Sequence, residues 1–107
     1  MVDIATFRQI ALSFPEVTEQ PHFHRAAFRV KKGIFTTLDE AAGQANVKLS
    51  EIDQNVFSSF DRSVIFPIPN KWGKQGWTTI DLDKVHVDML TDALSTAYQH
   101  IISKNKK

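Results

Sequence analysis

The apolar positions near the start of the chain repeat with the spacing of a helix. Within the first 15 residues they fall on one side of a helical turn, at Ile4, Phe7, Ile10, Ala11 and Phe14. Asp3 can cap the first turn with its carboxylate. Pro15 is expected to end the helix, because the residue before a proline avoids the α region.

The next part of the chain is rich in β-branched and aromatic residues, which predicts strands. Residues 17–23 are expected to be extended, and Pro21 favours an edge position because proline cannot donate to a ladder. Residues 26–30 and 34–38 predict a hairpin around the turn at 31–33. Further strands are expected at residues 45–49, 64–66 and 77–82.

Two more helices complete the prediction. Ser50 and Asp53 form a capping-box pattern at the start of a helix that runs to about residue 59 and buries Ile52, Val56 and Phe60. A terminal helix is expected from about residue 86 to 103, followed by a frayed tail at 103–107. Its buried stripe is predicted to be Val87, Leu90, Leu94, Ala97, Tyr98 and Ile101. This order predicts one domain over residues 1–107, of the α+β class, with helices packed on one face of an antiparallel sheet.

Alternation also assigns the strand side chains to two faces of the sheet. The predicted inward residues are Phe28, Val30, Ile34, Leu38, Val47, Leu49, Ile80 and Leu82. The other face then carries Arg29, Lys31, Phe35, Thr37, Asn46, Lys48, Trp77, Thr79 and Asp81. Aromatic rings among cations are typical of sheets that bind single-stranded nucleic acid. The alternative is a solvated face whose aromatic side chains pack under loops or against a partner.

Residues 67–77 hold both tryptophans, with Lys71 and Lys74 beside them. Two prolines and two glycines in the same stretch predict a shaped loop and not a helix. Exposed indole rings next to ammonium groups can stack on bases or hold an anion. The alternative is that Trp72 and Trp77 close the edge of the core.

Composition limits the classes of function. The 107 residues are 42% hydrophobic, which is enough for a packed core, and the formal net charge is +1. A nearly neutral protein has no general attraction to nucleic acid or membranes, so anion binding must come from a local patch. The absence of cysteine excludes disulfides, thiol nucleophiles and cysteine zinc sites. The chain shows neither a signal-peptide pattern nor a span of about 20 apolar residues, so a cytoplasmic protein without a membrane partner is expected.

No catalytic motif pairs a nucleophile with a base, so we expect a protein that is not an enzyme and needs no cofactor. Two pairs of side chains could bind a metal: His22 with His24, and Asp88 with Asp92. The histidine pair has no third ligand near it in sequence. We interpret the histidines as turn residues and the aspartates as solvated charge, and expect no metal site.

Several short motifs together resemble the MmcQ/YjbR family, small bacterial proteins often labelled as DNA-binding. They are the segment 12–19, Pro21-His22-Phe23, Ala27-Phe28-Arg29-Val30, Val47-Lys48-Leu49-Ser50, Asn70-Lys71-Trp72-Gly73, Gly76-Trp77 and Ala97-Tyr98. The resemblance implies a CyaY-like (frataxin-like) two-layer sandwich and DNA binding through a double-wing type of surface. Position by position, it points at His22, Arg29, Lys48, Lys71, Trp72 and Trp77. The family commonly has glycine after the Pro-His-Phe motif, whereas this chain has His24 and Arg25, which add charge at that turn.

We therefore predict a monomeric, non-enzymatic module that binds DNA weakly and with salt dependence. The predicted nucleic-acid-binding surface is Arg25, Arg29, Lys48, Lys71, Trp72, Lys74 and Trp77, with His22 as a ligand-binding residue. The alternative is a domain that binds a protein or a small ligand, with the Trp72 and Trp77 loop as a pocket wall.

Overall fold

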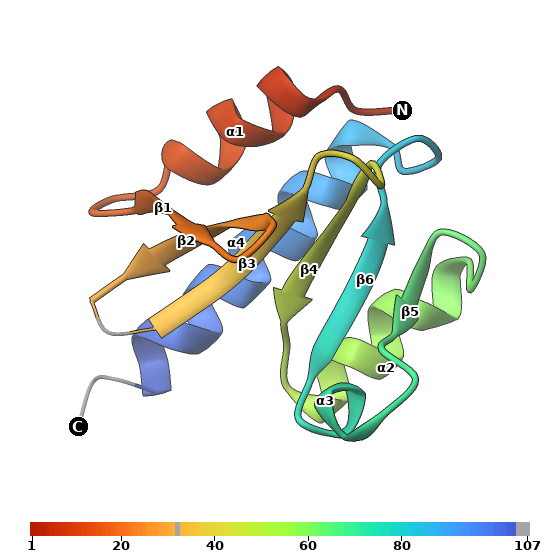
Figure 1. Ribbon diagram of the computed structural model, residues 1–107. Coiled ribbons are helices and arrows are strands. Elements are labelled where there is room, and N and C mark those ends of the chain that lie inside the picture. The colour runs from red at the N-terminus through yellow and green to blue at the C-terminus, as the bar shows by residue number, and fades with distance from the viewer. Residues whose placement is uncertain (32, 105–107) are drawn as a thin grey trace.

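A computed structural model describes residues 1–31 and 33–104 and shows a six-stranded antiparallel sheet in the order β1-β2-β3-β4-β6-β5 (Figure 1). The strands are β1 (Thr18–His22), β2 (Arg25–Val30), β3 (Gly33–Asp39), β4 (Gln44–Lys48), β5 (Ile65–Pro67) and β6 (Trp77–Asp81). The helices are α1 (Ile4–Leu12), α2 (Glu51–Phe60), α3 (Lys71–Lys74) and α4 (Val87–Lys104). Lys32 in the predicted hairpin turn and residues 105–107 of the predicted tail lie outside the described residues, and α4 ends at Lys104, one residue beyond the predicted helix.

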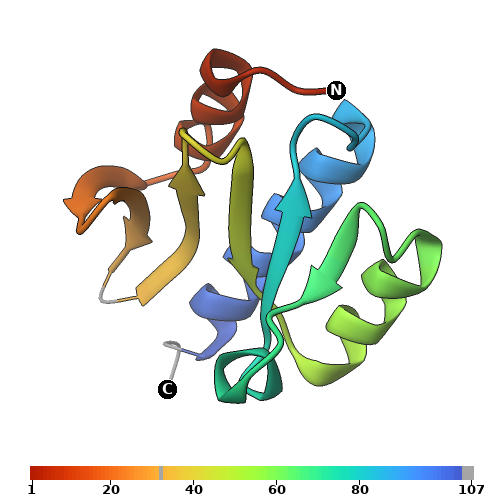
Figure 2. The same ribbon diagram turned by 45° about the vertical axis from the view of Figure 1, so that its right-hand side comes forward.

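The sheet is covered by helix on one side and open on the other. In Figures 1 and 2 α4 crosses behind the sheet, and α2 lies beside β5. The core between the layers includes Leu90 and Leu94 of α4 and Phe7 of α1, all fully buried. Phe7 meets Phe28 edge to face, with ring centroids 5.6 Å apart. The predicted α+β class, with an antiparallel sheet and helices on one face, is confirmed. No helix in the described part of the chain is long and apolar enough to cross a membrane.

Both predicted helix caps are present. The Asp3 carboxylate accepts a hydrogen bond from the Thr6 backbone N–H at 2.7 Å, and the Ser50 hydroxyl accepts one from the Asp53 N–H at 3.1 Å. α1 ends at Leu12, two residues before the last predicted apolar position. Val87, predicted to be buried, is 39% exposed because it is the first residue of α4 and lies outside the part that crosses the sheet.

A β-bulge changes the predicted faces of β3. Thr36 pairs with Phe28, but the next pair along the ladder is Ile34 with Arg29, so Phe35 is the extra residue. Phe35 is therefore fully buried against Phe14 and Tyr98, with ring centroids 6.0 and 5.6 Å away. The prediction that Phe35 lies on the open face and Ile34 in the core is wrong, because one inserted residue reverses the alternation.

The buried side of α2 also differs from the prediction. Ile52, Val56 and Phe60 are 75%, 50% and 67% exposed. The helix instead buries Gln54, Phe57 and Ser58, which lie on nearly the opposite side at 100° per residue. α2 lies at the β5 end of the sheet and contacts the rest of the molecule along this one side. The hydrogen bonds of Gln54, described below, orient it.

Candidate functional site

A recess of about 370 Å³ lies on the face of the sheet that α4 does not cover. We call it the open-face recess. Strands β3 and β4 supply its floor, the β1–β2 hairpin supplies one wall, and α3 supplies the other with the segment before it and the start of β6. Its lining residues are His22, Arg25, Thr37, Asn46, Ile68, Trp72 and Trp77. Four of these, His22, Arg25, Trp72 and Trp77, are site residues predicted from the sequence.

The tryptophan wall is built by two close backbone contacts. A Cβ on Gly73 would stand 1.9 Å from the Ile68 carbonyl oxygen, and one on Gly76 would stand 1.9 Å from the Leu49 carbonyl oxygen. Gly76 also has φ +106°, which side chains disfavour. These two glycines let the chain fold back tightly, so that α3 packs against the end of β6. The predicted loop therefore contains a four-residue helical turn, and the prediction of no helix in it is wrong.

The position of Trp72 follows from a side-chain cap. The Asn70 side-chain oxygen accepts a hydrogen bond from the Trp72 backbone N–H at 2.9 Å, which starts α3. Half of the Trp72 surface is exposed. The alternative in which both tryptophans close the edge of the core therefore fails for Trp72, whereas Trp77 is half-buried. Trp72 offers an aromatic surface to a ligand.

A buried amide ties this wall to the rest of the domain. The Gln54 side-chain nitrogen donates to the Gly73 carbonyl at 2.9 Å and to the Thr78 hydroxyl at 3.1 Å, and lies 3.3 Å from the Trp77 carbonyl. Gln54 is on the buried side of α2, so α2, α3 and β6 are held as one unit. This contact has no signal in the sequence, since glutamine is usually a surface residue.

Polar and cationic groups face the tryptophans across the sheet. Lys48 is the register partner of Trp77, and its ammonium group lies 5.6 Å from the centre of the Trp77 ring system, within cation–π range. On the neighbouring row, the Thr79 hydroxyl donates to the Asn46 side-chain oxygen at 2.8 Å, which fixes the amide. Both contacts lie on the face to which alternation assigned these residues.

Arg25 stands at the opposite wall. Its NH2 nitrogen is 3.8 Å from an Asp39 carboxylate oxygen, and its NH1 nitrogen is buried without a hydrogen-bond partner. Arg25 also lines the cavity next to α1, and its guanidinium keeps hydrogen-bonding capacity that Asp39 does not use. No carboxylate is among the described residues that line the recess. This arrangement favours an anionic or electron-rich ligand.

The structure does not bring all the predicted cations together. Lys71 and Lys74 line a separate groove between α2 and α3, which Glu51 also lines. Arg29 pairs with Ile34 on the open face but does not line the recess. The predicted surface is thus divided: Arg25, Arg29 and Lys48 share the sheet face, and the two lysines of α3 belong to another groove.

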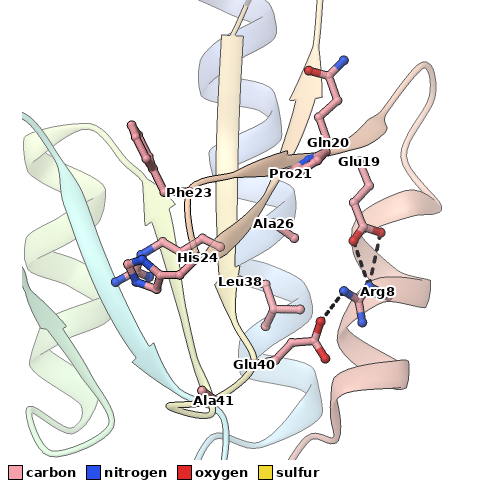
Figure 3. A pocket seen from close by; sticks show the side chains of 11 residues that line it. Arg8, Glu19, Gln20, Pro21, Phe23, His24, Ala26, Leu38, Glu40 and Ala41 are labelled. Carbon is pink, nitrogen blue, oxygen red and sulfur yellow. Dashed lines mark hydrogen bonds and ion pairs between the residues drawn. The ribbon is translucent and has the colours of Figure 1, made fainter.

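A cavity of about 590 Å³ lies on the other side of the β1–β2 hairpin, next to α1 (Figure 3). There the Arg8 guanidinium donates to Glu40 at 2.6 Å and to Glu19 at 3.0 and 3.2 Å. The bond to Glu40 has the largest effect in raising the pKa of Arg8, followed by the bonds to Glu19. Because two carboxylates already neutralise this cation, we interpret the cluster as a clamp that ties β1 and the β3–β4 turn to α1.

The two histidines considered for a metal site point to different partners. His22 lines the open-face recess, whereas the His24 ring lies 3.8 Å from an Asp39 oxygen. Within residues 1–31 and 33–104, no three side chains of His, Asp or Glu come close enough to hold a metal ion. Asp88 and Asp92 line a groove between α2 and α4.

Comparison with known proteins identifies the family. The model of the YjbR family matches residues 12–100. A search of proteins with curated descriptions finds no match. Among solved structures, the Deinococcus radiodurans protein DR2400, with a domain of the family DUF419, has a TM-score of 0.83 and 19% identity; the match covers 100% of this chain and 83% of that one. At this identity the likeness shows the fold alone, and the comparison with frataxins stays a prediction.

Proposed function

This chain belongs to the YjbR family, and we propose that it is a non-enzymatic protein that binds single-stranded DNA on the open face of its sheet. The observation that carries the proposal is the open-face recess, whose lining combines Trp72 and Trp77 with Arg25 and with the small polar side chains of Thr37 and Asn46. Aromatic rings stack on bases of any sequence, and neighbouring cations neutralise phosphates. This combination requires no reactive group.

Single strands fit the recess better than a duplex. Its volume of about 370 Å³ suits one base or nucleotide, and the bases of a duplex are stacked inside the helix. The cations also favour modest affinity. Of the predicted binding cations, three in the described residues, Arg25, Arg29 and Lys48, share the sheet face, and the net charge of the whole chain is +1. Micromolar or weaker binding is expected at physiological salt.

The test is fluorescence anisotropy with a labelled 12-nucleotide oligo(dT) and a duplex of equal length, over a salt series. Three phosphate contacts predict a slope of about −2 in log K against log salt for the single strand. Trp72→Ala should weaken binding by roughly 5- to 150-fold with the slope unchanged, because it removes a stacking surface. Lys48→Ala should instead flatten the slope by about 0.7.

Two lysine variants serve as matched controls. Lys74→Ala removes a cation from the groove between α2 and α3, and Lys84→Ala removes one near the start of α4. Both should bind like the wild type. No binding of the single strand at low salt, or equal affinity in wild type and Trp72→Ala, would overturn the proposal.

A second function is favoured by the size of the recess. Volumes of about 300–1,000 Å³ are typical of small-molecule sites, so the recess could hold a free aromatic anion with the tryptophans as its walls. Competition separates the two functions. Thymidine monophosphate is the competitor, and its affinity is first measured with the protein alone. The small-ligand function replaces DNA binding if thymidine monophosphate binds as tightly as the 12-mer and displaces it at the concentration at which it saturates the protein.

A further inference from the structure

The β1–β2 hairpin ends in an exposed aromatic ring. His22 pairs with Arg25, so the loop between the strands is only two residues long, Phe23 and His24. Phe23 is 91% exposed, more than any other large apolar residue described. Burial therefore gives no reason for a phenylalanine at this position.

The backbone gives no reason for it either. Phe23 has φ +60°, and His24, the second residue of the loop, does not share the positive φ. Two-residue hairpin loops with a positive φ at the first position favour glycine there. A bulky side chain in this conformation is a rare and strained outlier. Outliers of this kind cluster at functional sites, where the surrounding structure holds them.

The ring lies where the open-face recess and the cavity next to α1 meet. Phe23 itself lines the cavity next to α1, and its ring centroid is 4.9 Å, edge to face, from that of His22, which lines the open-face recess. Figures 1 and 2 together show the hairpin tip projecting from the sheet on the side away from α4. In Figure 3 Phe23 points away from the cluster around Arg8.

The base of the hairpin is held firmly. Glu19 in β1 accepts two hydrogen bonds from Arg8 of α1, and β1 pairs with β2 along its whole length. A ring presented by a supported hairpin loses little freedom on binding, which favours affinity. The geometry points to Phe23 as a ligand-contacting residue that stacks on the base next to the one held in the open-face recess. This inference rests on the proposed function and extends its binding surface from the recess to the hairpin tip.

The decisive variant is Phe23→Gly, because it should move stability and binding in opposite directions. Glycine adopts a positive φ without strain, so the thermal midpoint should equal or exceed that of the wild type. Affinity for the labelled 12-nucleotide oligo(dT) should fall at least five-fold, since a stacked base contributes at least that much. Phe23→Trp should keep wild-type affinity, and Phe23→Leu, apolar but not aromatic, should lose it.

His24→Ala is the matched control, since it changes the other residue of the same loop and should bind like the wild type. If wild type binds and Trp72→Ala does not, but Phe23→Gly binds equally to wild type, this inference fails and the proposed function stands. If wild type itself does not bind, the proposed function fails. A Phe23→Gly variant that loses affinity and stability together would show that Phe23 supports the hairpin, and would overturn the inference.

Discussion

Gln54 is a polar side chain that the fold buries at a junction of three elements. It is 8% exposed, and its single amide nitrogen serves acceptors in α3 and β6. Both tryptophans of the recess belong to these two elements. One residue on α2 thus helps to set the geometry of a site with which it has no direct contact.

Replacing Gln54 with Ala should destabilise the protein by about 2–3 kcal/mol, because the buried acceptors on Gly73 and Thr78 lose their donor. Urea unfolding followed by tryptophan fluorescence measures this change. Asn55→Ala on the exposed side of the same helix is the control and should change stability by less than about 0.5 kcal/mol. Equal midpoints for the two variants would show that the amide does not hold the tryptophan wall.

At the scale of elements, α4 buries its apolar stripe, whereas α2 exposes its own. In α4 the residues Leu90, Leu94, Ala97 and Tyr98 are buried, as the spacing predicts. In α2 the stripe of Ile52, Val56 and Phe60 is exposed. The difference lies in position, since α4 crosses the middle of the sheet and α2 lies beside β5, where one side alone is covered.

This contrast gives a paired prediction for two truncations of apolar side chains to alanine. Leu94→Ala should destabilise the protein by about 2–5 kcal/mol, because it opens a cavity in the core. Phe60→Ala should cost less than about 1 kcal/mol although it removes more apolar atoms, because most of its surface is already in water. Urea midpoints measure both. A larger loss for Phe60→Ala would mean that α2 buries its stripe in solution.

Periodicity and turn chemistry predict most of the elements. Every strand and the three longer helices lie within a few residues of the predicted bounds. Helix ends were predictable where Asp3, Ser50 and Pro15 mark them by local chemistry. The side on which a helix packs is not local information. It depends on tertiary contacts such as those of Gln54, and so the buried side of α2 was not predictable from its spacing.

The site was predictable to the extent that it follows strand parity. Asn46, Lys48, Trp77 and Thr79 lie on the predicted face, because β4 and β6 pair without a bulge. In β3 a bulge reversed the parity and moved Phe35 into the core. The strained backbone of Phe23 has no sequence signal beyond the short distance between two strands, since phenylalanine itself does not indicate a positive φ.

On the scale of the whole molecule, the two faces of the sheet differ in what they carry. One face carries the buried contacts with α4, and the other carries the recess and the projecting hairpin. Tyr98 links α4 to the end of α1 through a 2.8 Å hydrogen bond to the Pro15 carbonyl, so the covered side closes around the core. Substitutions on the open face should therefore change binding with little effect on stability.

The pH dependence of stability is a property of the whole molecule to which two aspartates contribute. Hydrogen bonds from the Thr6 hydroxyl and backbone N–H lower the pKa of Asp3, and bonds from the Ser63 hydroxyl and backbone N–H lower the pKa of Asp61. A pKa lowered by folding means that the unfolded chain binds more protons. The stabilisation by these carboxylates is therefore complete above about pH 5, and it is lost as the pH falls through about 4 and below.

The double variant Asp3→Asn, Asp61→Asn tests this pH dependence, because its amides keep a hydrogen-bond acceptor but do not titrate. The urea midpoint of the variant should fall less than that of the wild type between pH 5.5 and pH 3. An equal fall in both proteins would show that neither carboxylate contributes to acid sensitivity.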